Sequence, residues 1–166
     1  EKTFLALPAG LRKHVLLGDN QSADGTFDVA KRLGINVIRH DKNYGYGGNL
    51  KRLYRHALVQ GADIVVELHP DFQYDPRLVD VLVTYVARGY YDVMHGDRMR
   101  RRDEALAGGM HLYRYYGNRI LSTLENLWFG VNFSEWHCGM KAYRAEVLAQ
   151  LPFDTYPDTH AFATDI

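Results

Sequence analysis

The chain has 166 residues, of which 46% are hydrophobic and 24% are charged, as in an ordinary globular domain large enough to bury a core. Its 20 Lys and Arg residues balance 20 Asp and Glu residues, so it lacks the basic excess of a nucleic-acid-binding protein, and we expect no nucleic-acid partner. No run of 18 apolar residues occurs, which excludes a membrane-spanning helix within this sequence, and the single cysteine, Cys138, is typical of a reducing compartment such as the cytoplasm.

Apolar runs alternate with amphipathic stretches along most of the chain. Short strands are predicted at residues 14–17, 35–38, 62–68 and 91–95. Helices are predicted between them, at residues 26–33, 50–59 and 76–88, the last beginning at a proline. This alternation predicts an α/β domain with a mostly parallel sheet and helices on both faces. Ligands of such sheets bind beyond the carboxyl ends of the strands.

The stretch from Leu112 to Trp128 carries a broad apolar stripe at helical spacing. Two interpretations remain open. A helix that faces the core would bury both Leu112 and Trp128, whereas a helix that meets a lipid surface would leave part of the stripe exposed. After this stretch, Ser134 to Arg144 is predicted to be a loop that enters a short strand, followed by a brief helix at residues 145–151.

Asp19 stands at the end of the first strand, where a carboxylate can accept hydrogen bonds from a ribose or a base. The alternative is a turn that caps the following helix. That alternative accounts for Asp24 and Thr26, which leaves Asp19 without a role in the fold.

The loop from His69 to Pro76 follows the most apolar strand. Asp71 and Gln73 are two residues apart, so in an extended segment both side-chain oxygens would point to one side. Oxygen ligands suit Mg²⁺ or Mn²⁺, either of which would neutralise a diphosphate leaving group. A helix-initiating turn is compatible with this prediction, because capping needs only Asp75.

Two further segments carry candidate groups. Arg98 begins a basic cluster that continues through Arg102 and suits a phosphate-bearing partner. For Arg100 to Arg102 the alternative is a solvated loop. Glu135 and His137 flank Trp136, and either could act as a general base. A lone histidine such as His137 is more often structural.

Five segments match motifs of one enzyme family in the same order along nearly the whole chain. Residues 18–26 match V-D-D-G-S-x-D-G-T, 43–47 match N-x-G-x-G, 69–76 match D-A-D-L-Q-H-P-P, 96–98 match G-S-R, and 135–141 match D-x-x-S-G-F-R. The chain therefore resembles the inverting family 2 glycosyltransferases of the GT-A fold, which include dolichol-phosphate mannose synthase and bacterial polyprenyl-phosphate sugar transferases.

The resemblance implies a role for each matching residue. It implies that the nucleotide sugar is bound by Asp19, Ser22, Asn43, Gly45 and His69. It implies that Asp71 and Gln73 hold Mg²⁺ or Mn²⁺, that Arg98 and Arg119 meet the phosphate of the acceptor, and that Glu135 and Arg98 act at the reacting centre.

The sequence also departs from the family pattern. His69 replaces the first Asp of the D-x-D pair, which puts metal binding in question, and Gln21 replaces a Gly. The first strand of the family would precede Glu1, so we expect residues 1–166 to form a single GT-A domain, incomplete at both ends, that lacks this strand.

These observations predict an inverting transferase that moves a sugar from a nucleoside-diphosphate sugar to an acceptor, for which the resemblance implies a polyprenyl phosphate at the inner face of a membrane. One alternative is a non-catalytic domain that binds sugar nucleotides or serves as a scaffold. A second alternative is a transferase whose acceptor is a soluble or cell-wall glycan.

Overall fold

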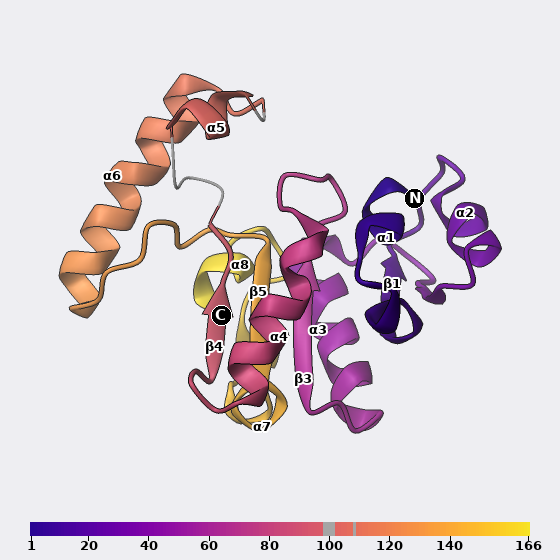
Figure 1. Ribbon diagram of the computed structural model, residues 1–166. Helices are drawn as coiled ribbons and strands as arrows, with labels where there is room; N and C mark the ends of the chain where they lie inside the picture. Colours follow the sequence, from indigo (N-terminus) through magenta and orange to yellow (C-terminus); the bar gives the residue numbers. More distant parts are fainter. Residues whose placement is uncertain (98–101, 108) are drawn as a thin grey trace.

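Figure 1 shows the computed structural model, which describes residues 1–97, 102–107 and 109–166. Arg98 and its neighbours Arg100 and Arg101 lie outside the described residues. Within the described ranges, no helix combines the length and apolar character that crossing a membrane requires.

The first part of the chain forms a small parallel sheet. Strands β1 (Leu16–Asp19) and β2 (Asn36–Arg39) pair in parallel, and α2 (Thr26–Arg32) connects them. Helix α1 (Lys2–Ala6) and the 3₁₀ helix η1 (Ala9–His14) precede β1. The predicted strand therefore begins at Leu16 rather than at His14, because His14 ends η1.

The second sheet contains β3 (Ile64–Leu68), β5 (Met140–Arg144) and β4 (Val93–His95), in that spatial order. Strand β5 lies between the other two and is antiparallel to both. The prediction of a mostly parallel sheet is wrong for this part of the domain. After β4 the chain runs through two helices and re-enters the sheet at the same end at which it left, since His95 at the end of β4 pairs with Lys141 at the start of β5. A short apolar run in the sequence does not indicate the direction of its strand.

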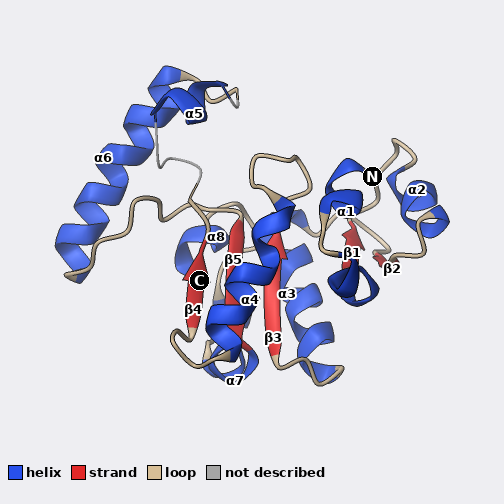
Figure 2. Cartoon of the chain, viewed as in Figure 1, coloured by secondary structure: helices blue, strands red, loops and turns tan. Residues whose placement is uncertain are grey.

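Helices cover both faces of the second sheet, as predicted (Figure 2). The 3₁₀ helix η2 (Pro76–Leu78) leads into α4 (Val79–Ala87), which packs on one face. Helices α3 (Gly45–Val59), α7 (Ala145–Gln150) and α8 (Phe162–Asp165), with the 3₁₀ helix η3 (Phe153–Thr155), cover the other. Strand β5 alternates between the two cores: Met140 and Ala142 pack with α4, and Tyr143 packs with α3.

Helices α5 (Arg102–Ala107) and α6 (Leu112–Phe129) project away from the rest of the domain (Figure 1). The predicted helix at Leu112–Trp128 is confirmed, but the interpretation that it faces the core is wrong. Leu112 is 56% exposed and Trp128 is 84% exposed.

Candidate functional site

The loop after β1 and the start of α3 are joined by hydrogen bonds. The Asn20 amide donates to the Asn43 side-chain oxygen (2.7 Å) and to the Gly45 carbonyl (3.1 Å). The Tyr44 backbone N–H donates to the Asn20 side-chain oxygen (2.9 Å). The structure thus brings together the two segments that the resemblance assigns to the nucleotide sugar.

Asp19, the last residue of β1, is buried, with an exposed fraction of 1%. Its Oδ1 accepts a hydrogen bond from the Ser22 backbone N–H (3.0 Å), and its Oδ2 lies 3.4 Å from Arg39 Nε. Among the described residues, Oδ2 has no hydrogen-bond partner. A buried carboxylate oxygen without a donor is suited to accept one from a ligand. The expectation that Asp19 has no role in the fold is wrong, because its other oxygen holds the Ser22 turn.

Asp19→Ala is therefore expected to lower the free energy of unfolding by about 2 kcal/mol, because it leaves the partly buried Ser22 N–H unpaired and removes the partner of Arg39. Asp19→Asn should lose less, since its amide oxygen can still accept from Ser22. Urea unfolding measures both, with Asp28→Ala as an exposed acidic control on α2. Equal stability of Asp19→Ala and Asp28→Ala would contradict this role.

The glycine-rich turn that opens α3 packs against the C-terminal segment of the chain. A Cβ at Gly45 would lie 2.5 Å from the Asp158 carbonyl oxygen, and one at Gly47 would lie 2.5 Å from that of Pro157. Gly47 N–H donates to the Asp158 carbonyl (2.8 Å), and the buried Lys51 amino group donates to its carboxylate (2.8 Å). The structure thus gives these glycines a packing role, and contact of Gly45 with a nucleotide sugar stays a prediction.

A buried polar network lies beside the end of β3, on the face covered by α3. Glu67 is 5% exposed and accepts hydrogen bonds from the hydroxyls of Tyr46 (2.8 Å) and Tyr54 (2.6 Å). The Tyr46 hydroxyl also lies 2.8 Å from His69 Nε2. Burial alone would raise the pKa of Glu67, but the nearby His69 ring (Nε2 3.4 Å from Oε1) and the hydrogen bonds from Tyr54 and Tyr46 outweigh it and lower this pKa below its ordinary value.

Glu67, Tyr46 and Tyr54 were not among the site residues predicted from the sequence. The one signal was an acidic residue inside the most apolar strand, where a charge needs partners. The partners, Tyr46 and Tyr54, lie about two turns apart on α3. They could have been predicted only if the alignment of α3 against β3 had been known.

The loop after β3 is a tight turn rather than an extended segment. The Gln73 backbone N–H donates to Asp71 Oδ1 (3.0 Å), and Phe72 between them has φ 65°. The geometry predicted for Asp71 and Gln73 is therefore wrong, although the turn keeps the two residues adjacent. Asp75 caps the following helix by accepting from the Arg77 backbone N–H (3.0 Å), as the compatible alternative required.

The chemistry of this loop fits a hard divalent cation. Asp71 supplies a carboxylate and Gln73 an amide oxygen, and such a cation commonly keeps water and diphosphate oxygens as its remaining ligands. Among the described residues, no group of three or more His, Cys, Asp or Glu side chains could hold a metal on its own. A cation here would therefore depend on the bound diphosphate.

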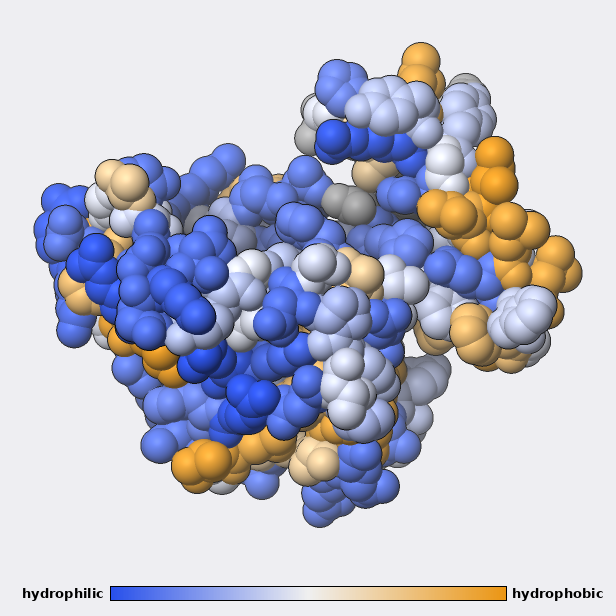
Figure 3. Space-filling model, turned by 180° about the vertical axis from the view of Figure 1, so that it is seen from behind, coloured by the Kyte–Doolittle hydropathy of each residue, from blue (hydrophilic) through white to orange (hydrophobic). Residues whose placement is uncertain are grey.

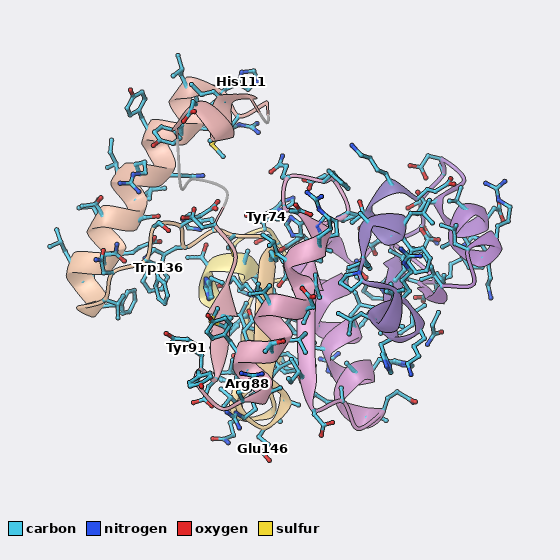
Figure 4. The ribbon with its side chains drawn as sticks, viewed as in Figure 1. Tyr74, Arg88, Tyr91, His111, Trp136 and Glu146 are labelled. Atoms are coloured by element: carbon cyan, nitrogen blue, oxygen red, sulfur yellow. The ribbon has the colours of Figure 1, made fainter. Side chains whose placement is uncertain are left out.

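The segment before β5 ties α6 to the body of the domain. Trp136 Nε1 donates to the Asn126 side-chain oxygen (2.9 Å), so the indole lies against α6 (Figure 4). His137 lies between the Thr164 hydroxyl (2.8 Å from Nδ1) and Glu125 (3.6 Å from Nε2), which favours a structural role over that of a general base. Glu135 is 2% exposed and is the other candidate base in this segment.

A hollow of about 530 Å³ lies between α6 and the following segment. Arg119 lines it together with polar side chains that include Ser122, Thr123 and Asn126. Nearby, the Ser134 hydroxyl donates to Asp97 at the end of β4 (2.6 Å), immediately before Arg98. The hollow thus has the cation and hydroxyl groups that a phosphate-bearing acceptor requires.

Comparison with known proteins identifies the family. The sequence model described as glycosyl transferase family 2 matches residues 3–151. The chain belongs to glycosyl transferase family 2. Membership in this family implies the GT-A, Rossmann-like α/β fold, with the antiparallel β5 described above.

Three proteins with similar sequences illustrate the family. An uncharacterized protein of Methanocaldococcus jannaschii is 28% identical over 92% of this chain, a low-salt glycan biosynthesis hexosyltransferase of Haloferax volcanii is 32% identical over 78%, and an undecaprenyl-phosphate mannosyltransferase of Micrococcus luteus is 26% identical over 84%. The matches span 62%, 30% and 58% of the lengths of these relatives.

Proposed function

We propose that this glycosyltransferase moves a sugar from a nucleoside-diphosphate sugar to a polyprenyl phosphate, with inversion at the anomeric carbon. The observation that carries the proposal is the family 2 match over residues 3–151. It is supported by the similarity to the undecaprenyl-phosphate mannosyltransferase.

The donor would bind over the loops that follow β1 and β3. Oδ2 of Asp19, which has an ion-pair contact with Arg39 but no hydrogen bond within the described residues, would accept a hydrogen bond from the base or the ribose. Asp71 and Gln73 would hold a divalent cation against the diphosphate. A bound cation would neutralise charge on the departing nucleoside diphosphate.

The acceptor would bind in the hollow beside α6. Arg119 would contact its phosphate, and the adjoining hydroxyl and amide groups would orient it. A phosphate oxygen is already anionic and needs no strong base to attack the anomeric carbon. We therefore propose that Arg98 and Glu135 position the reacting groups near the anomeric carbon.

The exposed face of α6 supports an acceptor that lies in a membrane. Its polar side faces the body, where Ser122 is buried and Asn126 holds Trp136. Its opposite side carries exposed apolar residues: Leu112, Tyr113, Tyr116, Ile120, Leu121, Leu124, Leu127 and Trp128. Figure 3 shows this face as a hydrophobic patch. A water-facing helix normally has the reverse arrangement, so we propose that α6 lies on a lipid surface at the periphery of a membrane.

Replacing Leu124, Leu127 and Trp128 together with Gln is expected to reduce association with liposomes at least about ten-fold, because each residue loses apolar area that lipid would cover. The melting temperature should change little, since all three side chains are exposed. Flotation with vesicles measures the association. Val59→Gln, on an 82% exposed residue at the end of α3, serves as the control. Undiminished flotation of the triple variant would exclude α6 as the lipid-facing element.

A transfer assay tests the whole proposal. Radiolabelled UDP- and GDP-sugars are incubated with the protein and either undecaprenyl phosphate or a soluble glycan, and the product is separated by organic extraction. Label in the organic phase is the expected result. Label confined to the soluble glycan would support the alternative acceptor, and nucleotide binding without transfer to either would support a non-catalytic domain.

A further inference from the structure

His69 departs from the acidic residue that family 2 motifs carry at this position, and its ring is firmly held. Its backbone N–H donates to the Gly139 carbonyl (2.9 Å). A Cβ at Gly139 would lie 2.2 Å from Nδ1, 2.4 Å from Cγ and 2.5 Å from Cε1 of the imidazole. Because these three distances are nearly equal, the face of the ring, rather than the in-plane lone pair of Nδ1, lies over the Gly139 α-carbon.

The hydrogen bonds of Tyr46 determine which ring nitrogen carries the proton. An ionised carboxylate only accepts hydrogen bonds, so the Tyr46 hydroxyl gives its single proton to Glu67. The same hydroxyl oxygen then accepts from His69 Nε2 at 2.8 Å. A neutral imidazole with its proton on Nε2 keeps a lone pair on Nδ1. In the described part of the chain this nitrogen has no hydrogen-bond partner, and the His69 side chain is 33% exposed.

The arrangement matches that of metal-binding histidines, whose second nitrogen is usually bonded to a carboxylate or to a group that connects to one. Asp71 lies two residues further along the same loop. Its Oδ1 is engaged by Gln73, and Oδ2 has no hydrogen bond within the described residues. Mg²⁺ requires oxygen ligands more strictly than a transition-metal dication such as Mn²⁺ does, so an imidazole nitrogen in the ligand set disfavours Mg²⁺ relative to Mn²⁺.

We propose that His69 Nδ1 is a ligand of the donor-site cation and that Tyr46, bonded to Glu67, is the positioning residue that keeps this nitrogen available, so that the site prefers Mn²⁺ to Mg²⁺. This inference rests on the proposed function, because the diphosphate supplies the remaining ligands. It goes further in assigning to this chain a mixed nitrogen and oxygen site in place of two acidic residues.

Calorimetric titration of UDP and GDP in Mn²⁺ and in Mg²⁺ tests the preference. The wild type is expected to bind the better nucleotide about ten-fold more tightly in Mn²⁺, and His69→Asp should remove most of that ratio. Tyr46→Phe should weaken binding in Mn²⁺ by about ten-fold, as expected for loss of a group that orients a metal ligand. Tyr54→Phe is the matched control, because it removes the other tyrosine hydroxyl from Glu67 without contacting His69.

Pulsed electron paramagnetic resonance gives a direct readout that a purely structural role would not change. The Mn²⁺–nucleotide complex of the wild type should show coupling to a ¹⁴N nucleus, and this coupling should disappear in His69→Asp. The inference would be overturned if the nucleotide bound through Asp71 but with the same Mn²⁺-to-Mg²⁺ affinity ratio in the wild type and in His69→Asp. It would also be overturned if Tyr46→Phe and Tyr54→Phe lost equal affinity in Mn²⁺. Either result would leave the proposed function standing. Absence of nucleotide binding in both cations would overturn both.

Discussion

Asp71→Ala is expected to weaken cation-supported binding of UDP or GDP by about a hundred-fold, or roughly 3 kcal/mol, which is the size of a lost charge-assisted contact. The reason is that Asp71 offers a carboxylate oxygen, Oδ2, that has no hydrogen bond within the described residues, since only Oδ1 accepts from Gln73. Calorimetry in excess Mn²⁺ measures the change.

Asp75→Ala is the control for Asp71→Ala, since it lies in the same loop but caps α4 through η2. It should lower the free energy of unfolding by about 1 kcal/mol and leave nucleotide affinity unchanged. If Asp71→Ala binds the nucleotide as well as the wild type does, the cation assignment is wrong.

The second large effect is a loss of stability in acid that originates at His95 on β4. Its ring stacks on Phe133 with centroids 5.1 Å apart, and its Nδ1 is buried with no hydrogen-bond partner among the described residues. Burial, helped by the positive charge of Lys141, lowers the pKa of His95 to about 4, although Glu67 acts in the opposite direction. The ordinary pKa of an unfolded histidine is about 6.5.

Between these two pKa values the unfolded chain binds a proton at His95 that the folded chain does not. Above about pH 6.5, His95 is neutral in both states and should cost no stability. As the pH falls from 6.5 to 4, the free energy of unfolding should decrease by up to about 3 kcal/mol. Urea unfolding at a series of pH values measures this slope. His95→Phe should flatten it, whereas the same substitution at the exposed His14 should not. An equal slope in His95→Phe and the wild type would place the acid sensitivity elsewhere.

Much of the fold followed from local patterns. The helix at Pro76 was predictable because proline fixes the first turn and Asp75 can cap it, and both features are present. The alternation of apolar runs located the strands to within a few residues. The direction of β5 was not predictable, because it depends on how the chain returns after α6, which no local periodicity records.

The candidate site was predictable as a set of loops but not as a set of contacts. Motif order identified Asp19, Asp71 and His69, whereas the turn at Phe72 and the hydrogen bond from Tyr46 to Glu67 depend on tertiary packing. The exposure of α6 was not predictable either. An apolar stripe predicts that one side of the helix is covered, but not whether the protein core or a lipid surface covers it.

We expect the loops after β1 and β3 to bind a nucleoside diphosphate together with a divalent cation. Calorimetry of the wild-type chain with UDP and with GDP, in Mn²⁺ and in excess EDTA, tests it most directly. One of the two nucleotides should bind with micromolar to millimolar affinity in Mn²⁺, and this binding should be lost in EDTA. Equal affinity with and without the cation, or no binding of either nucleotide in Mn²⁺, would contradict it.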